Sequence, residues 1–327
     1  MLGELSVNDS LAKVEQPDWK EFLACGIVSF VVGFLGMTSN VITVLVVMKN
    51  KSMRTPCFYL IAAHAVYSWV GAIGYFTNGL HYIGFAFDFL PKYYQRISCV
   101  FMYMTITASS PPSHLMTFLI GLERFLVIAF PLQYKQRSSY MTKVALIGAA
   151  AFAVFIGLTA LATTHRPFTH VIACYNMFSA FDMVYSVFFT YFNLVLSVAA
   201  VLCYGLMYGA ILWKKRKLLT AQDRTHPGAM ADQVQFLKRQ LSLLPLFNYL
   251  TLAYCIFGVG PPIIASTFSV VDGGIHLQRA SQYVIALKSG MPCIDFCILT
   301  LKCKEFRGSL ETVLKKHSNQ VEPLSLY

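Results

Sequence analysis

The sequence predicts an all-α integral membrane protein: a bundle of seven transmembrane helices with a short amphipathic helix after the last span. Two observations lead to this fold class. Of the 327 residues, 56% are hydrophobic and 13% are charged, whereas about a quarter of the residues in a soluble domain are charged. The apolar residues also form seven long runs, and about 20 apolar residues let a helix cross a bilayer with its backbone hydrogen bonds satisfied internally.

The runs follow one another along the chain without an internal repeat, a low-complexity tract or a second domain. They cover about Phe22 to Met48, Cys57 to Thr77, Cys99 to Leu122, Val144 to Thr164, Met183 to Trp213, Leu241 to Thr267 and Ser281 to Leu301. A soluble helical bundle could not hide so much apolar surface. We therefore divide the chain into an N-terminal segment, residues 1–21, a transmembrane domain, residues 22–301, and a tail with the amphipathic helix, residues 302–327.

The positive charges indicate how the chain is oriented. Lys and Arg gather in the first, third and fifth connections and in the tail, as in Lys214-Lys-Arg-Lys217, and positively charged loops stay on the cytoplasmic side. We therefore expect an extracellular N-terminus and a cytoplasmic C-terminus. The net charge of +11 then lies beside anionic lipid headgroups. No nucleic-acid-binding module accompanies it.

The acidic N-terminal segment shows no cleavable signal peptide, so we expect the first apolar run to direct insertion. Asn8-Asp9-Ser10 is a sequon for N-linked glycosylation on the expected extracellular side. Asn50-Lys51-Ser52 has the same pattern on the other side. Within the first run, we expect Asn40 to hydrogen-bond to neighbouring helices, because a polar group in a membrane needs partners.

The third run contains Pro111-Pro112 at its middle, which removes two backbone donors and predicts a bend. Three serines are placed to satisfy the freed carbonyl groups: Ser109, Ser110 and Ser113. With further kinks at Pro261 and Pro292, the bend predicts a cavity in the outer half of the bundle, where ligands bind between helices.

A charged pair, Glu123-Arg124, lies where the third run meets a basic connection. Charged side chains at a membrane edge cost free energy, so their presence indicates a function. Cys99 stands 25 residues before Arg124, roughly a bilayer thickness at ~1.5 Å per residue. The stretch from Leu122 to Tyr134, LERFLVIAFPLQY, resembles the Asp/Glu-Arg-Tyr region of rhodopsin-like G-protein-coupled receptors. The tail stretch 302–307, KCKEFR, resembles their amphipathic helix along the inner membrane face, and we expect Phe306 and Leu310 to face lipid.

This resemblance implies a plasma-membrane receptor, not an enzyme, that activates a heterotrimeric G protein when a small-molecule or peptide ligand binds. It also implies a disulfide between Cys99 and Cys174, the alternative being two free thiols. Residues implied in G-protein coupling are Glu123, Arg124, Phe125, Tyr134 and Tyr204. Membrane lipids are further expected partners. We expect no cofactor, and no metal because the nine cysteines lack metal-ligand spacing.

The sequence also departs from the family pattern. Asp295 begins the segment expected as Asn-Pro-x-x-Tyr, but the proline and tyrosine are missing. Ser68 stands about where many relatives have an aspartate in the second helix, and Val259 where a tryptophan is usual in the sixth. Such departures make the chain more similar to the divergent chemosensory receptors of nematodes than to hormone or amine receptors.

The candidate ligand-binding residues lie on the third, fifth and seventh runs: Met102, Tyr103, Ile106, Ser110, Phe189, Phe192, Tyr283 and Lys288. Aromatic and apolar residues at helical spacing often serve packing instead. Lys288 is the one lysine inside a run, and a buried cation is costly unless it is paired or hydrated. Three interpretations of it remain open: a polar packing residue in a wet cavity, a contact for an anionic ligand, and a retinal Schiff base as in an opsin.

Other classes of membrane protein would require sequence features different from those of a receptor. A transporter would show broken helices or ionisable residues at matching positions of two repeated halves, and the sequence has no such repeat. An intramembrane enzyme would carry a motif such as His-Glu-x-x-His or Gly-x-Ser-x-Gly, and neither occurs. The alternatives to a chemosensory receptor are an opsin-like photoreceptor, because of Lys288, and a membrane transporter, because it too is built from apolar helices.

Overall fold

The structure is a computed structural model. It describes residues 19–91, 93–164, 170–172, 174, 180–181, 183–221, 246, 248–261, 263–264, 267, 287–288 and 290–318. Tyr283 and Asn8 lie outside these residues.

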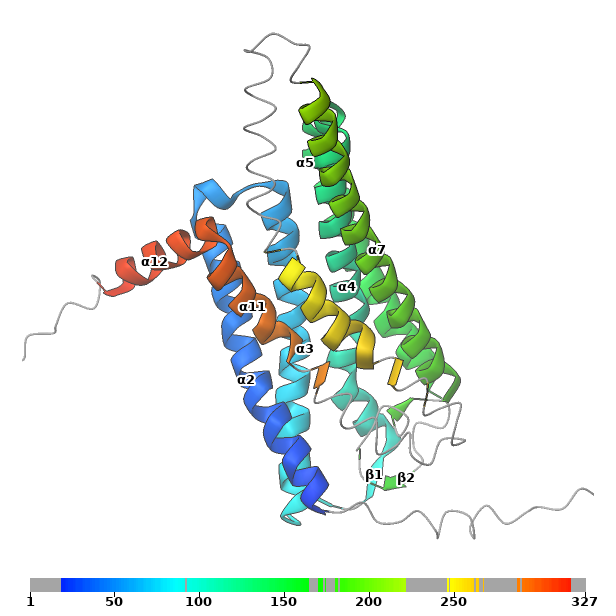
Figure 1. Ribbon diagram of the computed structural model, residues 1–327. Coiled ribbons are helices and arrows are strands. Elements are labelled where there is room, and N and C mark those ends of the chain that lie inside the picture. Colours follow the sequence, from blue (N-terminus) through cyan, green and yellow to red (C-terminus); the bar gives the residue numbers. More distant parts are fainter. Residues whose placement is uncertain are drawn as a thin grey trace, which may run out of the picture.

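Five long helices form the body of the bundle (Figure 1). They are α2 (Trp19–Lys49), α3 (Pro56–Ala86), α4 (Arg96–Ala129), α5 (Pro131–Ala162) and α7 (Met183–Ala221), with a short 3-10 turn, η1 (Lys51–Met53), between the first two. Each of the five is long and apolar enough to cross a membrane. They correspond in order to the first five predicted runs, and most extend beyond the predicted bounds because a helix continues past the hydrocarbon core into the aqueous layer.

The sixth and seventh predicted runs are described in part. Helical residues at 248–261 include a π-helical turn, η2 (Cys255–Val259), directly before Gly260 and Pro261. The seventh run contributes residues 287–288 and α11 (Met291–Lys302), after which the chain changes direction into α12 (Lys304–Ser318) (Figure 1). A π-helical turn often marks a functional position in a helix.

Helices α2 and α3 approach each other closely through glycine. A Cβ atom on Gly33 would lie 2.5 Å from the backbone nitrogen of Phe76, and one on Gly79 would lie 2.4 Å from that of Phe30. The Phe30 and Phe76 rings stack with centroids 4.8 Å apart. Small residues at such interfaces let helix backbones come into van der Waals contact, which drives association in lipid.

The serines beside the proline pair of α4 do not act as predicted. Ser109 donates to the carbonyl of Ile106 within α4. Ser110 donates to Oδ1 of Asn193 of α7 at 3.3 Å, and Oγ of Ser113 lies 3.0 Å from Nε2 of His64 of α3. The hydroxyl groups of Ser110 and Ser113 therefore link α4 to its neighbours. Asn40 was expected to hydrogen-bond to neighbouring helices. Among the described residues, its amide instead donates to the carbonyl of Gly36 in its own helix, at 2.8 Å.

The two ends of the bundle differ in structure. At one, which we call the disulfide end, Cys99 is bonded to Cys174, and β1 (Tyr93–Gln95) pairs antiparallel with β2 (His170–Ile172). We call the other the α12 end. There Phe306 is fully buried against a cluster from α2, α3 and α11 that includes Val46, Phe58 and Leu299. The prediction that Phe306 faces lipid is thus wrong, because α12 packs its apolar side onto the bundle.

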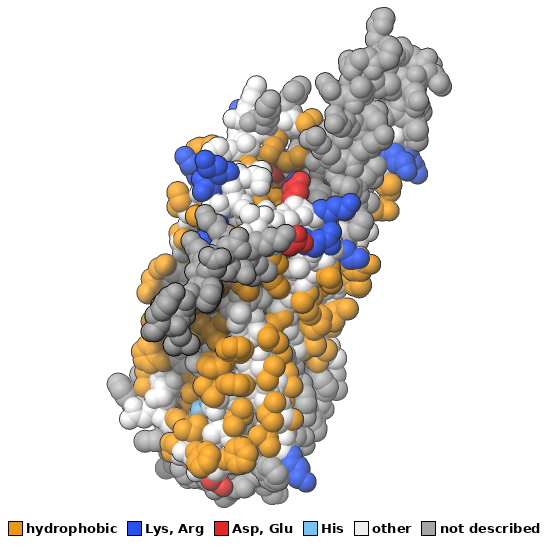
Figure 2. All heavy atoms as spheres, turned by 90° about the vertical axis from the view of Figure 1, so that its left-hand side faces the viewer, with side chains coloured by type: hydrophobic (Ala, Val, Ile, Leu, Met, Phe, Trp, Pro, Cys, Tyr) orange, Lys and Arg blue, Asp and Glu red, His pale blue; other side chains and the backbone are white. Residues whose placement is uncertain are grey.

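The flank of the bundle is apolar where a membrane would surround it. Figure 2 shows hydrophobic side chains over a broad band on the α2 side, with most of the Lys and Arg toward one end. Exposed apolar side chains of α2 include Ile27, Phe34 and Leu45. Large exposed apolar patches mark interaction surfaces, and on helices long and apolar enough to cross a membrane such a surface is suited to contact with lipid.

Candidate functional site

At the α12 end, Arg124 lies in a compact polar group that we call the arginine centre: Cys57, Glu123, Arg124 and Tyr134. The Nε of Arg124 lies 3.3 Å from Oε2 of Glu123 and donates to Sγ of Cys57 at 3.0 Å. The hydroxyl of Tyr134 donates to Oε1 of Glu123 at 2.7 Å. The group therefore joins α3, the last turns of α4 and the first turn of α5 through a charged pair.

Burial reduces the screening of these contacts by water. Glu123 is 8% exposed and Cys57 is 2% exposed, and an ion pair shielded from water is less screened than a surface pair. Burial and the neighbouring Glu123 carboxylate raise the pKa of Tyr134 above its usual value. The phenol therefore keeps its proton at neutral pH and remains a donor to the carboxylate.

Two further predicted coupling residues pack around the arginine centre. Tyr204 of α7 is buried in the same apolar cluster as Cys57, together with Leu60 and Ile128. Phe125 packs against this cluster and meets the ring of Phe130 edge-on, with centroids 6.5 Å apart. The structure thus brings all five predicted coupling residues to one end of the bundle, where each remains a candidate for that role.

At the disulfide end, several predicted ligand-binding residues are packed together. Tyr103, Ile106 and Phe189 are buried in one cluster with Cys99 and Cys174. Met102 packs against this cluster. The hydroxyl of Tyr103 lies 3.3 Å from the carbonyl oxygen of Cys174, to which it donates, and 3.0 Å from the hydroxyl of Tyr82. Tyr103 therefore helps to fix the disulfide-bonded segment in place.

Phe192 is a residue of α7, and its ring faces α5. Its ring stacks on Phe188 with centroids 5.6 Å apart and meets Phe152 of α5 at 5.7 Å. The remaining two described candidates, Ser110 and Lys288, line a cavity in the bundle interior that we call the polar cavity. It has a volume of about 50 Å³, enough for a few water molecules or one small ion.

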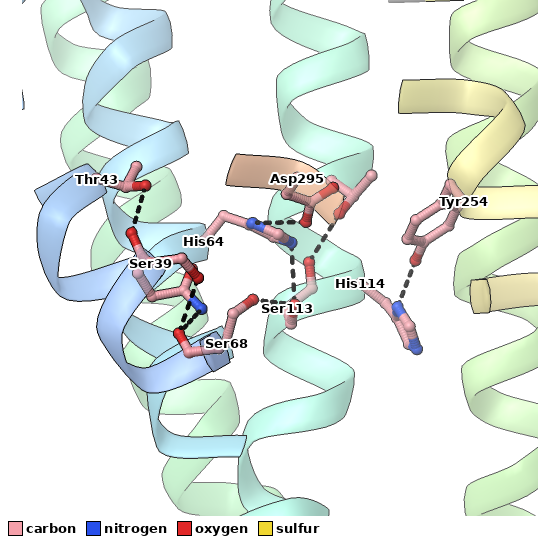
Figure 3. A network of polar contacts seen from close by, with 11 residues as sticks. Ser39, Thr43, His64, Ser68, Ser113, His114, Tyr254 and Asp295 are labelled. Atoms are coloured by element: carbon pink, nitrogen blue, oxygen red, sulfur yellow. Dashed lines mark hydrogen bonds and ion pairs between the residues drawn. The ribbon is translucent and has the colours of Figure 1, made fainter. Parts of the chain in front are cut away.

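The polar cavity is surrounded by side chains from four segments. Those that carry polar groups are Tyr67, Ser68, Ser109, Ser110, Ser113, His64, His114, Tyr75, Tyr254 and Lys288. Figure 3 shows the chain of contacts beside it. Ser113 Oγ lies 3.0 Å from Nε2 of His64 and 3.3 Å from Oγ of Ser68, and Nδ1 of His64 lies 3.8 Å from Oδ2 of Asp295. Tyr254 and His114 are hydrogen-bonded through the phenol and Nδ1.

Sequence reasoning did not single out His64, His114 and Tyr254, although a signal was present. Histidine inside an apolar run is uncommon and points to a functional interior. In both α3 and α4 the histidine stands one helical turn from a serine: His64 is four residues before Ser68, and His114 is four residues after Ser110. This pattern places several polar groups on one helix face.

Comparisons with known proteins agree with this architecture. The family model of the serpentine type 7TM GPCR chemoreceptor Srsx matches residues 33–257. The chain therefore belongs to the Srsx family of serpentine chemoreceptors. Among solved structures, the crystal structure of squid rhodopsin matches with a TM-score of 0.70 and 12% sequence identity, over 95% of this chain and 90% of that chain. No curated protein matches the sequence.

These findings confirm the predicted fold and receptor class. The likeness to squid rhodopsin, over 95% of this chain, shows a rhodopsin-like seven-helix fold. At 12% identity it shows the fold alone. Membership of the Srsx family makes the chain a chemosensory G-protein-coupled receptor and a multi-pass membrane protein.

Proposed function

We propose that this Srsx receptor lies in the plasma membrane with its disulfide end outside the cell, binds a small extracellular ligand within the bundle, and activates a heterotrimeric G protein at its α12 end. The observation that carries the proposal is the arginine centre. Arg124 is held at one end of the bundle by an acid and a thiol from two helices, while the polar cavity reaches the same helix, α4, further along.

The proposed mechanism is a shift between two states. With the contacts of Arg124 closed, α3, α4 and the start of α5 are tied together, and the arginine is withheld from a partner. A ligand that binds more tightly to the state in which these contacts are released shifts the population toward it by its difference in affinity. Arg124, Phe125 and Tyr204 would then contribute to the surface that the G protein contacts, with Glu123 and Tyr134 acting as the restraint.

The test is nucleotide exchange on a purified G protein by the receptor in lipid nanodiscs, with a ligand panel. We expect ligand-dependent exchange in the wild type and its loss in Arg124→Ala. Lys304→Met is a matched control, because Lys304 is an exposed cation at the same end of the molecule. Absence of exchange with every ligand and every G-protein class, in a correctly folded receptor, would reject the proposal.

A photoreceptor is the second candidate, because Lys288 lines the polar cavity and a lysine there invites comparison with a retinal Schiff base. The cavity volume of about 50 Å³ is far below the ~300–1,000 Å³ of pockets that take drug-sized ligands, which favours a smaller occupant. Addition of retinal should produce no visible absorbance band. A band that disappears in Lys288→Met would establish the photoreceptor instead.

A further inference from the structure

The described residues that line the polar cavity supply hydrogen-bond donors and a cation, and they include no carboxylate. Lys288 reaches it from the seventh segment and His114 from α4. Among the described residues that surround the cavity, none is Asp or Glu. Its electrostatic character is therefore that of a site for negative charge, although it lies in the interior of a membrane-spanning bundle.

The hydrogen bond between Tyr254 and His114 fixes which ring nitrogen of the histidine carries the proton. A phenol is a far stronger acid than the N–H group of neutral imidazole, so the Tyr254 hydroxyl donates and Nδ1 of His114 accepts. The imidazole proton then lies on Nε2, which points away from Tyr254 in Figure 3. His114 is 8% exposed, and Nε2 meets no hydrogen-bond partner within the described part of the chain.

A buried donor without an acceptor is rare and calls for a bound water or ion. Lys288 requires a bound water or anion even more than His114 does, because an ammonium group inside a membrane needs a counter-charge or water. The structure gives it no carboxylate within 4.0 Å among the residues described. Asp295 is the acid on its own segment, but it lies about two turns away, roughly 10 Å along a helix, and faces His64.

We propose that the polar cavity is a binding site for a small monovalent anion, held between the ammonium group of Lys288 and the Nε2–H group of His114. The volume of about 50 Å³ admits a chloride ion or the carboxylate group of a small organic acid. A carboxylate would be the head of the chemosensory ligand, so that this form of the proposal rests on the proposed receptor function. A chloride ion would be a structural anion of the bundle.

The anion test uses the full-length receptor in nanodiscs of neutral lipid, without G protein or agonist. Its melting temperature is measured while gluconate is replaced at constant ionic strength by chloride, formate or acetate. A small anion that binds the folded protein should raise the Tm saturably, on the order of 2 °C. Gluconate is too large for the cavity and serves as the reference anion.

Variants assign the effect to the cavity. Lys288→Met and His114→Phe should each lose the anion-dependent rise, while Lys288→Arg keeps the charge and should retain part of it. Lys304→Met removes an exposed cation of α12 and should melt with the full anion dependence. If Lys288→Met does not fold, the anion dependence of the wild-type Tm and its loss in His114→Phe still test whether the cavity binds an anion.

Each outcome has a defined meaning. A rise with chloride alone supports an inorganic-anion site, and a rise with formate or acetate supports a site for a carboxylate headgroup. Equal Tm values in all four salts, or an anion effect that persists in both Lys288→Met and His114→Phe, would overturn the proposal. Because no G protein takes part, such a negative result leaves the proposed receptor function standing, whereas missing nucleotide exchange would count against that function alone.

Discussion

The Nε of Arg124 lies 3.0 Å from the Sγ of Cys57, so a thiol of α3 holds the arginine of α4 alongside Glu123. Sulfur is a weak acceptor, but Cys57 is buried and the Arg124 side chain is only 14% exposed. The contact also adds a second helix to the restraint. The release of Arg124 then requires α3 and α4 to separate locally, and not only the opening of a charged pair within α4.

Replacement of Cys57 should therefore raise basal signalling. Cys57→Ala removes the acceptor, and a loss of about 0.5–1 kcal/mol from the closed state raises the open population roughly twofold to fivefold. Cys57→Ser supplies an oxygen acceptor of similar size and should restore low basal exchange. Nucleotide exchange without ligand is the measurement.

A second buried thiol provides the control for Cys57. Cys203 is 7% exposed and lies beside Gly121, so Cys203→Ala deletes the same group from the interior. It should leave basal exchange unchanged. If Cys203→Ala and Cys57→Ala raise exchange equally, the effect is one of packing and the proposed restraint is wrong.

Glu123 carries the charge that the closed state depends on. Glu123→Gln keeps the shape of the side chain but removes a charge-assisted contact worth about 1 kcal/mol, so basal exchange should rise about fivefold. Tyr134→Phe removes one hydrogen bond to the carboxylate, at 2.7 Å, and should raise it less. A rise with Tyr134→Phe but none with Glu123→Gln would contradict the proposed order of importance.

Arg124→Ala separates binding from signalling. The variant lacks the group proposed to contact the G protein, whereas the polar cavity lies further along α4 and keeps its lining. Agonist binding should therefore persist while nucleotide exchange falls to near the level without receptor. Full exchange in a variant that reaches the cell surface would show that coupling does not depend on Arg124.

Much of the fold was predictable because hydrophobic length is a direct signal of a membrane span. The bounds were less so: the fifth run was predicted to end at Trp213, but α7 continues to Ala221. The fourth was predicted from Val144, but α5 begins at Pro131. Apolar composition marks the part of a helix inside hydrocarbon, whereas backbone hydrogen bonding carries the helix on through polar residues.

The site contacts also fall into two groups: those between residues adjacent in sequence, which could be predicted, and those between helices, which could not. Glu123 and Arg124 are adjacent in sequence, so their pairing needed no knowledge of tertiary structure. The contacts of Arg124 with Cys57, and of His64 with Ser113 and Asp295, depend on how each helix is rotated. A helix that is apolar all round gives little indication of that rotation, so the sequence could name polar residues but could not say which ones meet.

The proposed orientation can be tested through glycosylation. Asn8→Gln should abolish the mobility shift produced by glycosidase digestion of the receptor, because Asn8 is expected outside the cell. Asn50 carries the second sequon, and its side chain is half-buried and donates to the carbonyl of Val46 at 2.9 Å. Loss of the shift with Asn50→Gln instead would reverse the orientation.

The disulfide end supplies the last prediction. Cys99 and Cys174 are both fully buried and bonded to each other, and Tyr103 donates to the carbonyl oxygen of Cys174. Cys99→Ala and Cys174→Ala should each lower surface expression or ligand response, because the segment of Cys174 loses its covalent tie to α4. The double variant should be no worse than either single one, since one bond is lost in every case.

Tyr103→Phe provides a milder change at the same place, because it removes the hydrogen bond to Cys174 and leaves the covalent bond intact. It should reduce surface expression less than either cysteine variant. Surface labelling of all four variants gives the comparison. Losses that add in the double cysteine variant would mean that the two residues act separately, and the disulfide would then not be what holds this end of the bundle together.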